Sequence, residues 1–426
     1  MKMLIKGGRV INPADNTDEV RDLIIENGII LKSSKSVKDL TDVDNIIDAE
    51  GMLVMPGLID LHVHLREPGF EHKETIETGT KAAARGGFTG VCPMPNTNPA
   101  TDCKEVVEYI VNKAAEVSPV NVYPVGAVTI GQAGRENTNI EEMKEAGIFA
   151  ISEDGKSVMN SGIYRKAMKE AARLNIPVFA HCEDINLVEG GAINAGKKAQ
   201  ELGVKGITNA VEDIITARDI MLSRETGARL HLCHCSTKDS VEMVRKAKAE
   251  GLKVTAEVCP HHFTLCEEDI VSDDANYKMN PPIRSREDLE ALRRGLKEGV
   301  FDVIATDHAP HHADEKARGI AKAPFGIVGS ETAVALTITE LVDKGVITFM
   351  EMAEKMSYNP ARILGIDKGD ISEGKVADIV IIDHEAEYAI DVNEFASKGR
   401  NTPFNGRKVK GRVVKTIVAG DIVYSA

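Results

Sequence analysis

Two histidines, His62 and His64, lie one residue apart near the end of the apolar run LIDLHVHLREPG, residues 58–69. Successive side chains of a β-strand alternate between its two faces, so both imidazoles would lie on one face. Paired imidazoles of this kind can bind a divalent metal ion. The pair is equally compatible with an ordinary strand that ends in two polar residues. The rest of the sequence has to decide between these interpretations.

Imidazole and carboxylate side chains also end other apolar runs of the chain. The residues at these expected strand ends are Asp154 (after Glu153), His181, His234 and Asp307. Four histidines and two carboxylates are ligands that divalent metals such as zinc accept. Six ligands exceed the needs of one tetrahedral ion and are typical of two ions that share a bridging group. The pattern therefore predicts a metal centre.

Eight apolar or β-branched runs, separated by segments of helical periodicity, are expected to form parallel strands. They span residues 58–64, 87–96, 120–128, 147–154, 176–182, 229–235, 252–260 and 301–307. Eight βα units predict a (β/α)8 TIM-like barrel, in which the carboxyl ends of all strands meet at one face. The predicted metal ligands would then converge in one bowl.

Both ends of the chain carry short alternating β patterns and turn residues. We expect residues 1–52 and 368–426 to pair into one small β-sandwich domain, and residues 53–367 to form the catalytic barrel. Two separate terminal sheets are the alternative, but each would have a marginal core. The expected fold class is therefore α/β, a TIM-like barrel with a β-sandwich domain built from both termini.

Composition excludes several classes of partner. The chain of 426 residues has a formal net charge of −14 and a sequence pI of about 5.4, which disfavours a general nucleic-acid surface. No stretch approaches the roughly 18 apolar residues of a membrane span, and the N-terminus lacks a signal-peptide pattern, so we expect a cytoplasmic protein. Seven cysteines favour free, buried thiols in a reducing compartment. Five of them lie in apolar runs: Cys92, Cys182, Cys233, Cys235 and Cys259.

Strand alternation also sorts the neighbours of His234. If His234 points into the bowl, Cys233 and Cys235 should point outward, toward the helices. His231 lies three positions from His234 and should also face away from it, as a packing residue or as support for the ligands.

A set of motifs, present together and in order, resembles the class I dihydroorotases of the cyclic amidohydrolase superfamily. These motifs are HVHLREPG, MPNTNP, SEDG, AHCED, LCHCST, KMNPPIR, TDHAPH and APFGIVGSET. The resemblance covers essentially the whole chain. It implies a hydrolase acting on cyclic amides, which reversibly cyclises N-carbamoyl-L-aspartate to (S)-dihydroorotate and water in pyrimidine (UMP) biosynthesis.

The resemblance also implies roles for the predicted ligands. It implies two zinc ions per subunit, with His62 and His64 on the first and His181 and His234 on the second. A one-metal form is the alternative. Asp307, beside the first ion, would be the catalytic proton shuttle between the attacking water and the leaving amide nitrogen.

The bridging position is occupied by Asp154 in this reading, whereas hydantoinases use a carboxylated lysine there. Lys156 lies nearby and is the alternative bridge, although it follows a glycine that should end the strand. The absence of a lysine at the bridging position distinguishes the chain from the hydantoinases.

Substrate selection is expected to depend on Arg66, because a guanidinium can bind the ring carboxylate that dihydroorotate has and dihydrouracil lacks. The resemblance adds contacts to that carboxylate and to the amide edges of the ring. The expected substrate-binding set is His64, Arg66, Asn96, Asn280, His311, Phe325 and Gly326. The charged loop 308–329 is expected to contact the substrate, with a solvated connection as the alternative.

Two other functions are left open by the sequence. One is another cyclic-amide hydrolase, such as a hydantoinase, dihydropyrimidinase or allantoinase. The other is an inactive dihydroorotase-like subunit that supports aspartate transcarbamoylase, although such relatives have lost metal ligands. The family also implies a homodimer, and some members associate with aspartate transcarbamoylase while remaining active.

Overall fold

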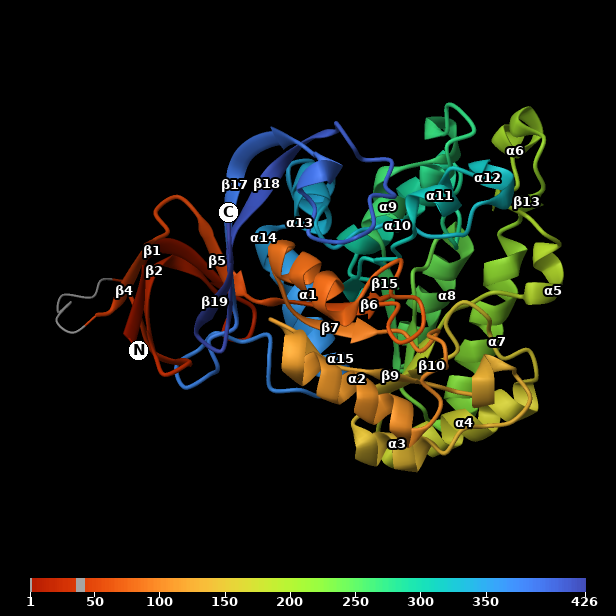
Figure 1. The fold of residues 1–426 in the computed structure, drawn as a ribbon, viewed down its shortest axis with the longest axis horizontal. Coiled ribbons are helices and arrows are strands. Elements are labelled where there is room, and N and C mark those ends of the chain that lie inside the picture. The colour runs from red at the N-terminus through yellow and green to blue at the C-terminus, as the bar shows by residue number, and fades with distance from the viewer. Residues whose placement is uncertain (1, 36–42) are drawn as a thin grey trace.

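The computed structural model describes residues 2–35 and 43–426. The expected N-terminal part of the small domain, residues 1–52, includes residue 1 and residues 36–42, which lie outside the described residues. In Figure 1 a curved sheet that contains both chain ends projects from a larger body, in which helices surround short strands.

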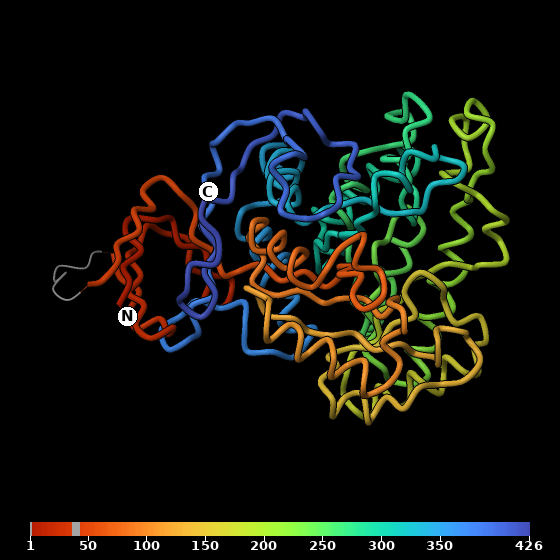
Figure 2. The backbone as a smooth tube through the Cα atoms, viewed as in Figure 1, coloured from red at the N-terminus to blue at the C-terminus, as the bar shows by residue number. Residues whose placement is uncertain are grey.

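The projecting sheet has eight strands, in the order β19-β18-β17-β5-β1-β2-β3, with β4 paired to β1. Its strands are β1 (Lys2–Asn12), β2 (Thr17–Glu26), β3 (Ile29–Ser34), β4 (Asn45–Asp48), β5 (Leu53–Pro56), β17 (Ile379–Ala389), β18 (Lys408–Val418) and β19 (Asp421–Ser425). β5 joins the two ends, because it pairs in parallel with β1 and antiparallel with β17. Figure 2 shows the red N-terminal strands beside the blue C-terminal ones. The termini therefore form one sheet.

Side chains from both ends of the chain share the core of this sheet. Met3, Leu23, Ile379 and Ile417 belong to one buried apolar cluster. Gly28, in the Asn-Gly turn between β2 and β3, has a φ of +80°, and a Cβ atom there would lie 2.4 Å from the carbonyl oxygen of Ala419. The turn of the N-terminal hairpin therefore requires glycine at position 28, because it packs against the turn of the C-terminal hairpin.

The larger body contains the parallel strands. They are β6 (Leu58–Val63), β7 (Phe88–Pro93), β8 (Asn121–Val122), β9 (Val125–Ala127), β10 (Ala150–Ser152), β11 (Val178–Ala180), β14 (Leu230–Leu232), β15 (Val254–Val258) and β16 (Val303–Ile304). Two sheets are formed, β6-β7-β8 and β9-β10-β11-β14-β15-β16. β8 and β9 follow one another along the chain. On the other side, parallel bridges connect Val63 to His308 and His308 to Ile327.

Helices follow most of these strands. They are α1 (Ile76–Arg85), α2 (Lys104–Val117), α3 (Ile140–Ala146), α4 (Ser161–Leu174), α5 (Ile185–Val188), α6 (Lys197–Leu202), α7 (Ala210–Thr226), α8 (Lys238–Ala249), α9 (Pro260–Thr264), α10 (Arg286–Lys297), α11 (Ala313–Lys316), α12 (Gly319–Lys322), α13 (Ala333–Thr337), α14 (Phe349–Ala353) and α15 (Asn359–Leu364). A small pair of strands, β12 (Ile193–Asn194) and β13 (Gly206–Ile207), lies within the long connection after β11.

Side-chain caps explain where two of these helices begin. Thr75 accepts a hydrogen bond from the backbone N–H of Thr78 at the start of α1. Ser285 accepts one from the N–H of Asp288 at the start of α10. Such caps satisfy backbone donors that have no partner within the helix. α1 then packs against β7, and α10 packs against α8 and α9.

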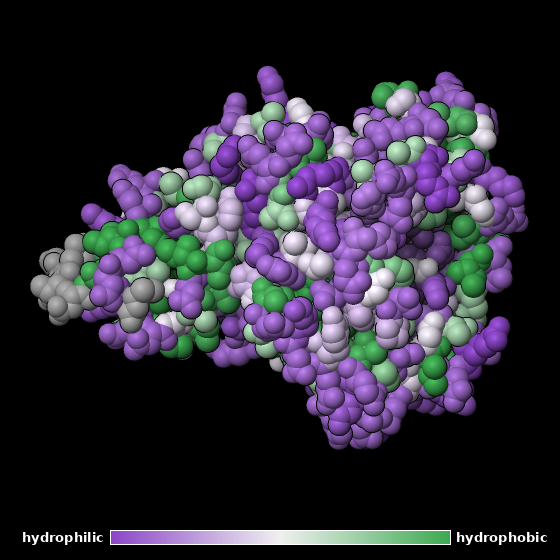
Figure 3. Space-filling model, in the orientation of Figure 1, coloured by the Kyte–Doolittle hydropathy of each residue, from purple (hydrophilic) through white to green (hydrophobic). Residues whose placement is uncertain are grey.

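The described residues contain no helix that is both long and apolar enough to span a membrane. The seven cysteines are free, and all except Cys103 are buried. The face shown in Figure 3 is largely polar, while apolar side chains gather on the projecting sheet. Exposed apolar residues of that sheet include Val20, Leu31, Ile46 and Ile422.

Candidate active site

A pocket of ≈ 170 Å³ lies where the parallel strands end. It is lined by His64, Arg66, Asn96, Asp154, Gly155, His181, His234, Asn280, Asp307, Ala309, His311, Phe325 and Gly326. Every residue that the sequence suggested for metal or substrate lines this pocket, except His62, which lies fully buried beside Asp154 and Asp307.

His62 and His64 each use one ring nitrogen for an outward hydrogen bond. Nδ1 of His62 donates to Glu257 at 2.9 Å, and Nδ1 of His64 donates to Oδ1 of Asn96 at 2.9 Å. In each ring this leaves the lone pair on Nε2. Nε2 of His62 lies 3.2 Å from Oδ1 of Asp154, and Nε2 of His64 lies 3.1 Å from Oδ1 of Asp307. A hydrogen bond from the outward ring nitrogen to an oxygen, as Nδ1 makes here, is typical of metal-binding histidines.

The second histidine pair faces the same carboxylate. Nε2 of His181 donates to Glu183 at 3.1 Å, which leaves Nδ1 of His181 facing Nε2 of His234 at 2.8 Å. Nδ1 of His181 also lies 3.6 Å from Oδ1 of Asp154. Asp154 is thus in contact with imidazoles from several strand ends, as a bridging carboxylate would be.

The donor set suits divalent cations. Ligand atoms of two groups, His62/His64/Asp307 and His62/Asp154/His234, lie within 4.8 Å of one another. Burial disfavours ionisation of Asp154 and Asp307, but the imidazoles outweigh it and hold the pKa of both carboxyls below the ordinary value. Within residues 2–35 and 43–426, Nε2 of His62 and Nδ1 of His234 are buried without a hydrogen-bond partner. Two ionised carboxylates among imidazole lone pairs form a site that attracts a cation.

Arg66 brings a cation to the same pocket. Its Nε donates to the carbonyl of Pro310 at 3.2 Å. Burial lowers the pKa of Arg66 to about 10, so the guanidinium stays charged at neutral pH. Among the described residues, no carboxylate lies within ion-pair distance of it. A charged, partly buried and unpaired guanidinium favours binding of an anion.

The loop 308–329 covers this side of the pocket. It contains α11 and α12, and Nε2 of His311 donates to the carbonyl of Phe325 at 2.8 Å. Because Nε2 then carries the hydrogen, its 3.3 Å approach to Arg66 is only a packing contact. The loop therefore contributes His311, Phe325 and Gly326 to the lining, as expected of a segment that contacts the substrate.

Strand alternation does not explain how these residues point into the pocket. β6 ends at Val63 and β14 at Leu232, and three lining residues have a left-handed backbone: Arg66 (φ 62°), His234 (φ 33°) and Asp307 (φ 48°). The expectation that Cys233 points toward the helices was wrong. The side chain of Cys233 lies near those of His62 and Glu257, because the positive φ at His234 interrupts the alternation.

Three buried carboxylates that support the site were missed. Glu257 accepts hydrogen bonds from Nδ1 of His62 and from Nε2 of His231, each at 2.9 Å. Asp60 accepts the N–H of Thr306 at 3.0 Å and so fixes the segment before Asp307. Glu183 supports His181. For Asp60 and Glu257 the available signal was an acidic residue inside an apolar run, which is rare unless the acid is paired. Glu183 follows its run and had no such signal.

The alternative bridge, Lys156, is exposed and does not line the pocket. Glu153, adjacent to Asp154, is buried and accepts the N–H groups of Val128 and Thr129 at 3.1 and 3.0 Å. These contacts hold the end of β10, so that Asp154 rather than Glu153 faces the histidines.

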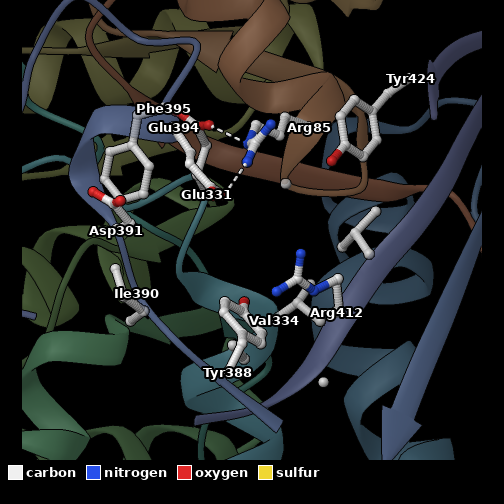
Figure 4. Close-up of a pocket in the computed structure, with 14 residues that line it drawn as sticks. Arg85, Glu331, Val334, Tyr388, Ile390, Asp391, Glu394, Phe395, Arg412 and Tyr424 are labelled. Atoms are coloured by element: carbon white, nitrogen blue, oxygen red, sulfur yellow. Dashed lines mark hydrogen bonds and ion pairs between the residues drawn. The ribbon is translucent and has the colours of Figure 1, made fainter. Parts of the chain in front are cut away.

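A second pocket lies apart from this site, between α1 and the C-terminal strands, and holds ≈ 50 Å³ (Figure 4). Arg85 forms ion pairs there with Glu331 at 3.0 Å and with Glu394 at 3.2 Å. Its charge is therefore already balanced. Among the described residues that line this pocket, none belongs to the predicted site.

Comparisons with known proteins place the chain in a family. The Dihydro-orotase-like family matches residues 51–240, and the Amidohydrolase family matches residues 208–424. A dihydroorotase of Acetivibrio thermocellus is 50% identical over 99% of this chain and 98% of its own length. A dihydroorotase of Pelotomaculum thermopropionicum is 51% identical over the same shares. The chain belongs to the dihydroorotase family. The expected resemblance is confirmed.

Solved structures of related enzymes share the fold of this dihydroorotase family member. The L-hydantoinase (dihydropyrimidinase) of Arthrobacter aurescens superposes with a TM-score of 0.90 at 25% identity, over 99% of this chain and 96% of its own. A D-hydantoinase (dihydropyrimidinase) of Thermus sp. gives 0.84 at 26%, over 100% and 96%. The α/β fold is thus that of the amidohydrolase enzymes.

Proposed function

We propose that this chain is a dihydroorotase, which interconverts N-carbamoyl-L-aspartate and (S)-dihydroorotate with release or uptake of water. The observation that carries the proposal is one pocket that holds both the carboxylate–imidazole cluster and the unpaired guanidinium of Arg66. The cluster suits hydrolysis of an amide, and the guanidinium suits a substrate with a carboxylate. Full-length identity of 50% to dihydroorotases supports the same activity.

The proposed cofactor is zinc, with two ions per subunit bridged by Asp154. His62 and His64 would hold the first ion, and His181 and His234 the second. When bound, zinc lowers the pKa of a coordinated water and polarises an amide carbonyl. The outward hydrogen bonds to Glu257, Asn96 and Glu183 support this assignment, because they fix which ring nitrogen faces the pocket.

The proposed catalytic residue is Asp307. Its carboxyl lines the pocket, and its depressed pKa keeps it ionised at neutral pH, ready to accept a proton. In ring opening it would take a proton from the attacking water and deliver it to the leaving amide nitrogen. In cyclisation the same carboxyl would act in the opposite order.

The substrate would lie between Arg66 and the loop 308–329. Arg66, Asn96 and His311 would receive the ring carboxylate. Asn280 and the backbone of Phe325 and Gly326 would receive the amide edges of the ring. His64 would contact both the metal and the substrate. Neutral rings such as dihydrouracil would leave the guanidinium of Arg66 unpaired, which penalises substrates without a carboxylate.

We further propose that the parallel strands close into an eight-stranded barrel. The continuity of β8 with β9, together with the bridges from Val63 to His308 and from His308 to Ile327, supports this closure. The terminal sheet would be the proposed β-sandwich domain, with boundaries at residues 52 and 368. A homodimer in the cytoplasm, with or without aspartate transcarbamoylase, completes the proposal.

One alternative has an observation in its favour. The two similar solved structures described above are hydantoinases (dihydropyrimidinases), so hydrolysis of another cyclic amide is the second candidate. Purified, zinc-loaded protein should be assayed for ring opening of L-dihydroorotate, dihydrouracil, hydantoin and allantoin in parallel. We expect turnover of dihydroorotate well above the others. Turnover of dihydrouracil without turnover of dihydroorotate would exclude the proposal, and no turnover of any would favour the inactive partner subunit.

A further inference from the structure

Lys316, the last residue of α11, is buried beside the substrate pocket with only 7% of its surface exposed. Its ammonium nitrogen donates to three backbone carbonyls, those of Gly326 at 2.9 Å, Pro324 at 3.1 Å and Lys278 at 3.2 Å. Among the described residues, no carboxylate lies within ion-pair distance of it. Three donors thus meet three carbonyl acceptors.

These carbonyls belong to two separate chain segments that present substrate-binding groups. Lys278 lies two residues before Asn280, and Pro324 and Gly326 flank Phe325. The N–H of Gly326 also donates to the carbonyl of Lys278 at 3.0 Å. Lys316 and this backbone bond therefore connect the Asn280 segment to the Phe325–Gly326 segment. The carbonyl of Gly326 also accepts a hydrogen bond from Nδ2 of Asn401, at 3.0 Å.

A buried ammonium without an acidic partner is costly to keep. Burial, with a smaller contribution from the charge of Lys278, lowers the pKa of Lys316 to about 7. An apolar side chain of similar length would avoid this cost but would remove one hydrogen bond from each of the three carbonyls. The carbonyls of Gly326 and Lys278 would keep one other donor each, whereas that of Pro324 would keep none among the described residues. The arrangement is therefore specific to a side chain that connects carbonyls, rather than one that only fills space.

We propose that Lys316 is a positioning residue, which holds the Asn280 segment and the Phe325–Gly326 segment together as one wall of the substrate pocket. It would set the affinity for the substrate ring without touching the ring or the metal ligands. The proposal rests on the proposed function for its substrate, but the structural connection itself does not.

The charge of Lys316 adds a pH dependence. A neutral amine keeps only two N–H donors, so one of its three carbonyls loses a partner as the pH rises through about 7. The charged groups that act on Lys316 are Lys278, Asp274 and Glu315, and Lys316 in turn acts on His311. Lys278 itself lies over the ring of Phe325, with Nζ 4.6 Å from the ring centroid.

Kinetics of Lys316→Met provide the first test. Lys322→Met is the matched control, because Lys322 is an exposed lysine in the same loop. We expect KM for L-dihydroorotate to rise about tenfold in Lys316→Met, with zinc content and kcat close to the wild type. Lys316→Gln, which retains two N–H donors, should recover part of the affinity. In the wild type, KM should rise as the pH increases through about 7, because Lys316 loses a donor. This rise should be absent in Lys316→Met.

Several results would overturn the proposal. An unchanged KM would do so, and so would equal effects of the two methionine variants. A joint loss of zinc, kcat and thermal stability would assign Lys316 to the scaffold of the fold instead.

Hydrogen–deuterium exchange of the peptide that spans residues 324–328 gives a second, substrate-free test. The N–H groups of Gly326 and Val328 are hydrogen-bonded to Lys278 and Asn401. Lys316→Met should accelerate their exchange about tenfold, while Lys322→Met should not. Unchanged exchange would refute the connection. If the wild type failed to act on dihydroorotate, the proposed function would fail, and exchange would still decide the role of Lys316.

Discussion

Arg66 contributes to the pocket through both its backbone conformation and its charged side chain. Its backbone has a φ of 62°, which turns the chain after β6 and directs the side chain to the pocket. Its guanidinium is unpaired among the described residues, so binding a carboxylate satisfies it. The proposed metal ligands His62 and His64 lie four and two residues earlier in the sequence. The segment 62–66 can therefore place the reacting amide and the substrate carboxylate relative to each other.

Replacing Arg66 by alanine should weaken substrate binding selectively. We expect KM for dihydroorotate to rise about 10- to 100-fold, since hydrogen bonds to a charged partner contribute about 1.5–3 kcal/mol. KM for dihydrouracil, which lacks the carboxylate, should stay unchanged. Steady-state kinetics with zinc analysis would measure both, and Arg135→Ala on the exposed surface serves as the control. Loss of zinc would contradict this assignment.

Asp307→Asn should abolish proton transfer while it keeps the size of the side chain. We expect kcat to fall about 10²- to 10⁴-fold, because a carboxamide cannot accept the proton. Single-turnover rates should be measured on protein whose zinc content equals that of the wild type. A fully loaded variant that turns over at the normal rate would remove Asp307 from the chemistry.

Site residues that end an apolar run could be predicted from the sequence, whereas those that lie inside a run could not. His181, His234 and Asp307 were recognisable because parallel strands bring their carboxyl ends to one face. Glu257 was not recognised, because its role depends on a partner, His62, that lies 195 residues earlier. The orientation of Cys233 depended on one backbone angle, which side-chain alternation cannot reveal.

At the scale of elements, β15 supports two strands of the site through one side chain. Glu257 accepts hydrogen bonds from His62 in β6 and from the backbone N–H of His234 after β14, at 2.9 and 3.1 Å. Glu257→Gln should therefore lower zinc affinity about 10- to 100-fold without unfolding the protein. Competition with a chelator would measure it, with the exposed Glu136→Gln as the control. Equal affinities in both variants would argue against this role.

The loop 308–329 depends on Gly326. Its φ is +127°, and a Cβ atom would lie 2.7 Å from Cβ of Ala309 and 3.0 Å from the Ala309 carbonyl oxygen. Gly326→Ala should therefore lower both Tm and kcat/KM. Gly299→Ala is the matched control, because Gly299 also has a positive φ but no atom within 4 Å. Each substitution should lower the free energy of unfolding by about 1 kcal/mol, because alanine is disfavoured at positive φ. Only Gly326→Ala should also lose activity. Similar kcat/KM values would contradict the steric argument.

The extents of the elements were less predictable than their order. The run 301–307 was expected to be one strand, whereas β16 spans only Val303–Ile304. Residues beyond it, including Thr306, leave the ladder because their N–H groups bond to side chains such as that of Asp60. Apolar periodicity locates a buried segment but does not show where side-chain acceptors replace the neighbouring strand. The helices were easier to locate, since caps such as Thr75 mark their starts.

For the whole molecule, the proposed metal centre would couple strands that are distant in the sequence, so its occupancy should affect global stability. Chelation should lower Tm, since a ligand at 100 times its Kd contributes about 2.7 kcal/mol. Asp154 and Asp307 outweigh burial and raise the pKa of His62 above its ordinary value, so protons compete with the metal. The gain in Tm should therefore shrink from pH 8 to about pH 5.5. Calorimetry with and without chelator would test this, and a pH-independent gain would contradict it.

The α/β class of the chain followed from its repeated βα pattern, while the closed barrel and the domain boundaries stay predictions. The pairing of β5 with both β1 and β17 realises the expected union of the termini. What the sequence could not supply is the curvature of that sheet and the position of the long connection after β11, because both depend on packing between distant segments. Local patterns contain no information on such contacts.

The left-handed backbones of His234 and Asp307 carry a lesson for protein engineering. Residues other than glycine or asparagine are disfavoured in this conformation, by about 1–2 kcal/mol each. Substituting glycine at either position would relieve that backbone cost, but it would also leave a cavity and remove a side chain of the proposed metal site. The expected result is lost turnover without a gain in Tm. Stability designs that replace residues of left-handed backbone by glycine should therefore leave these two positions unchanged.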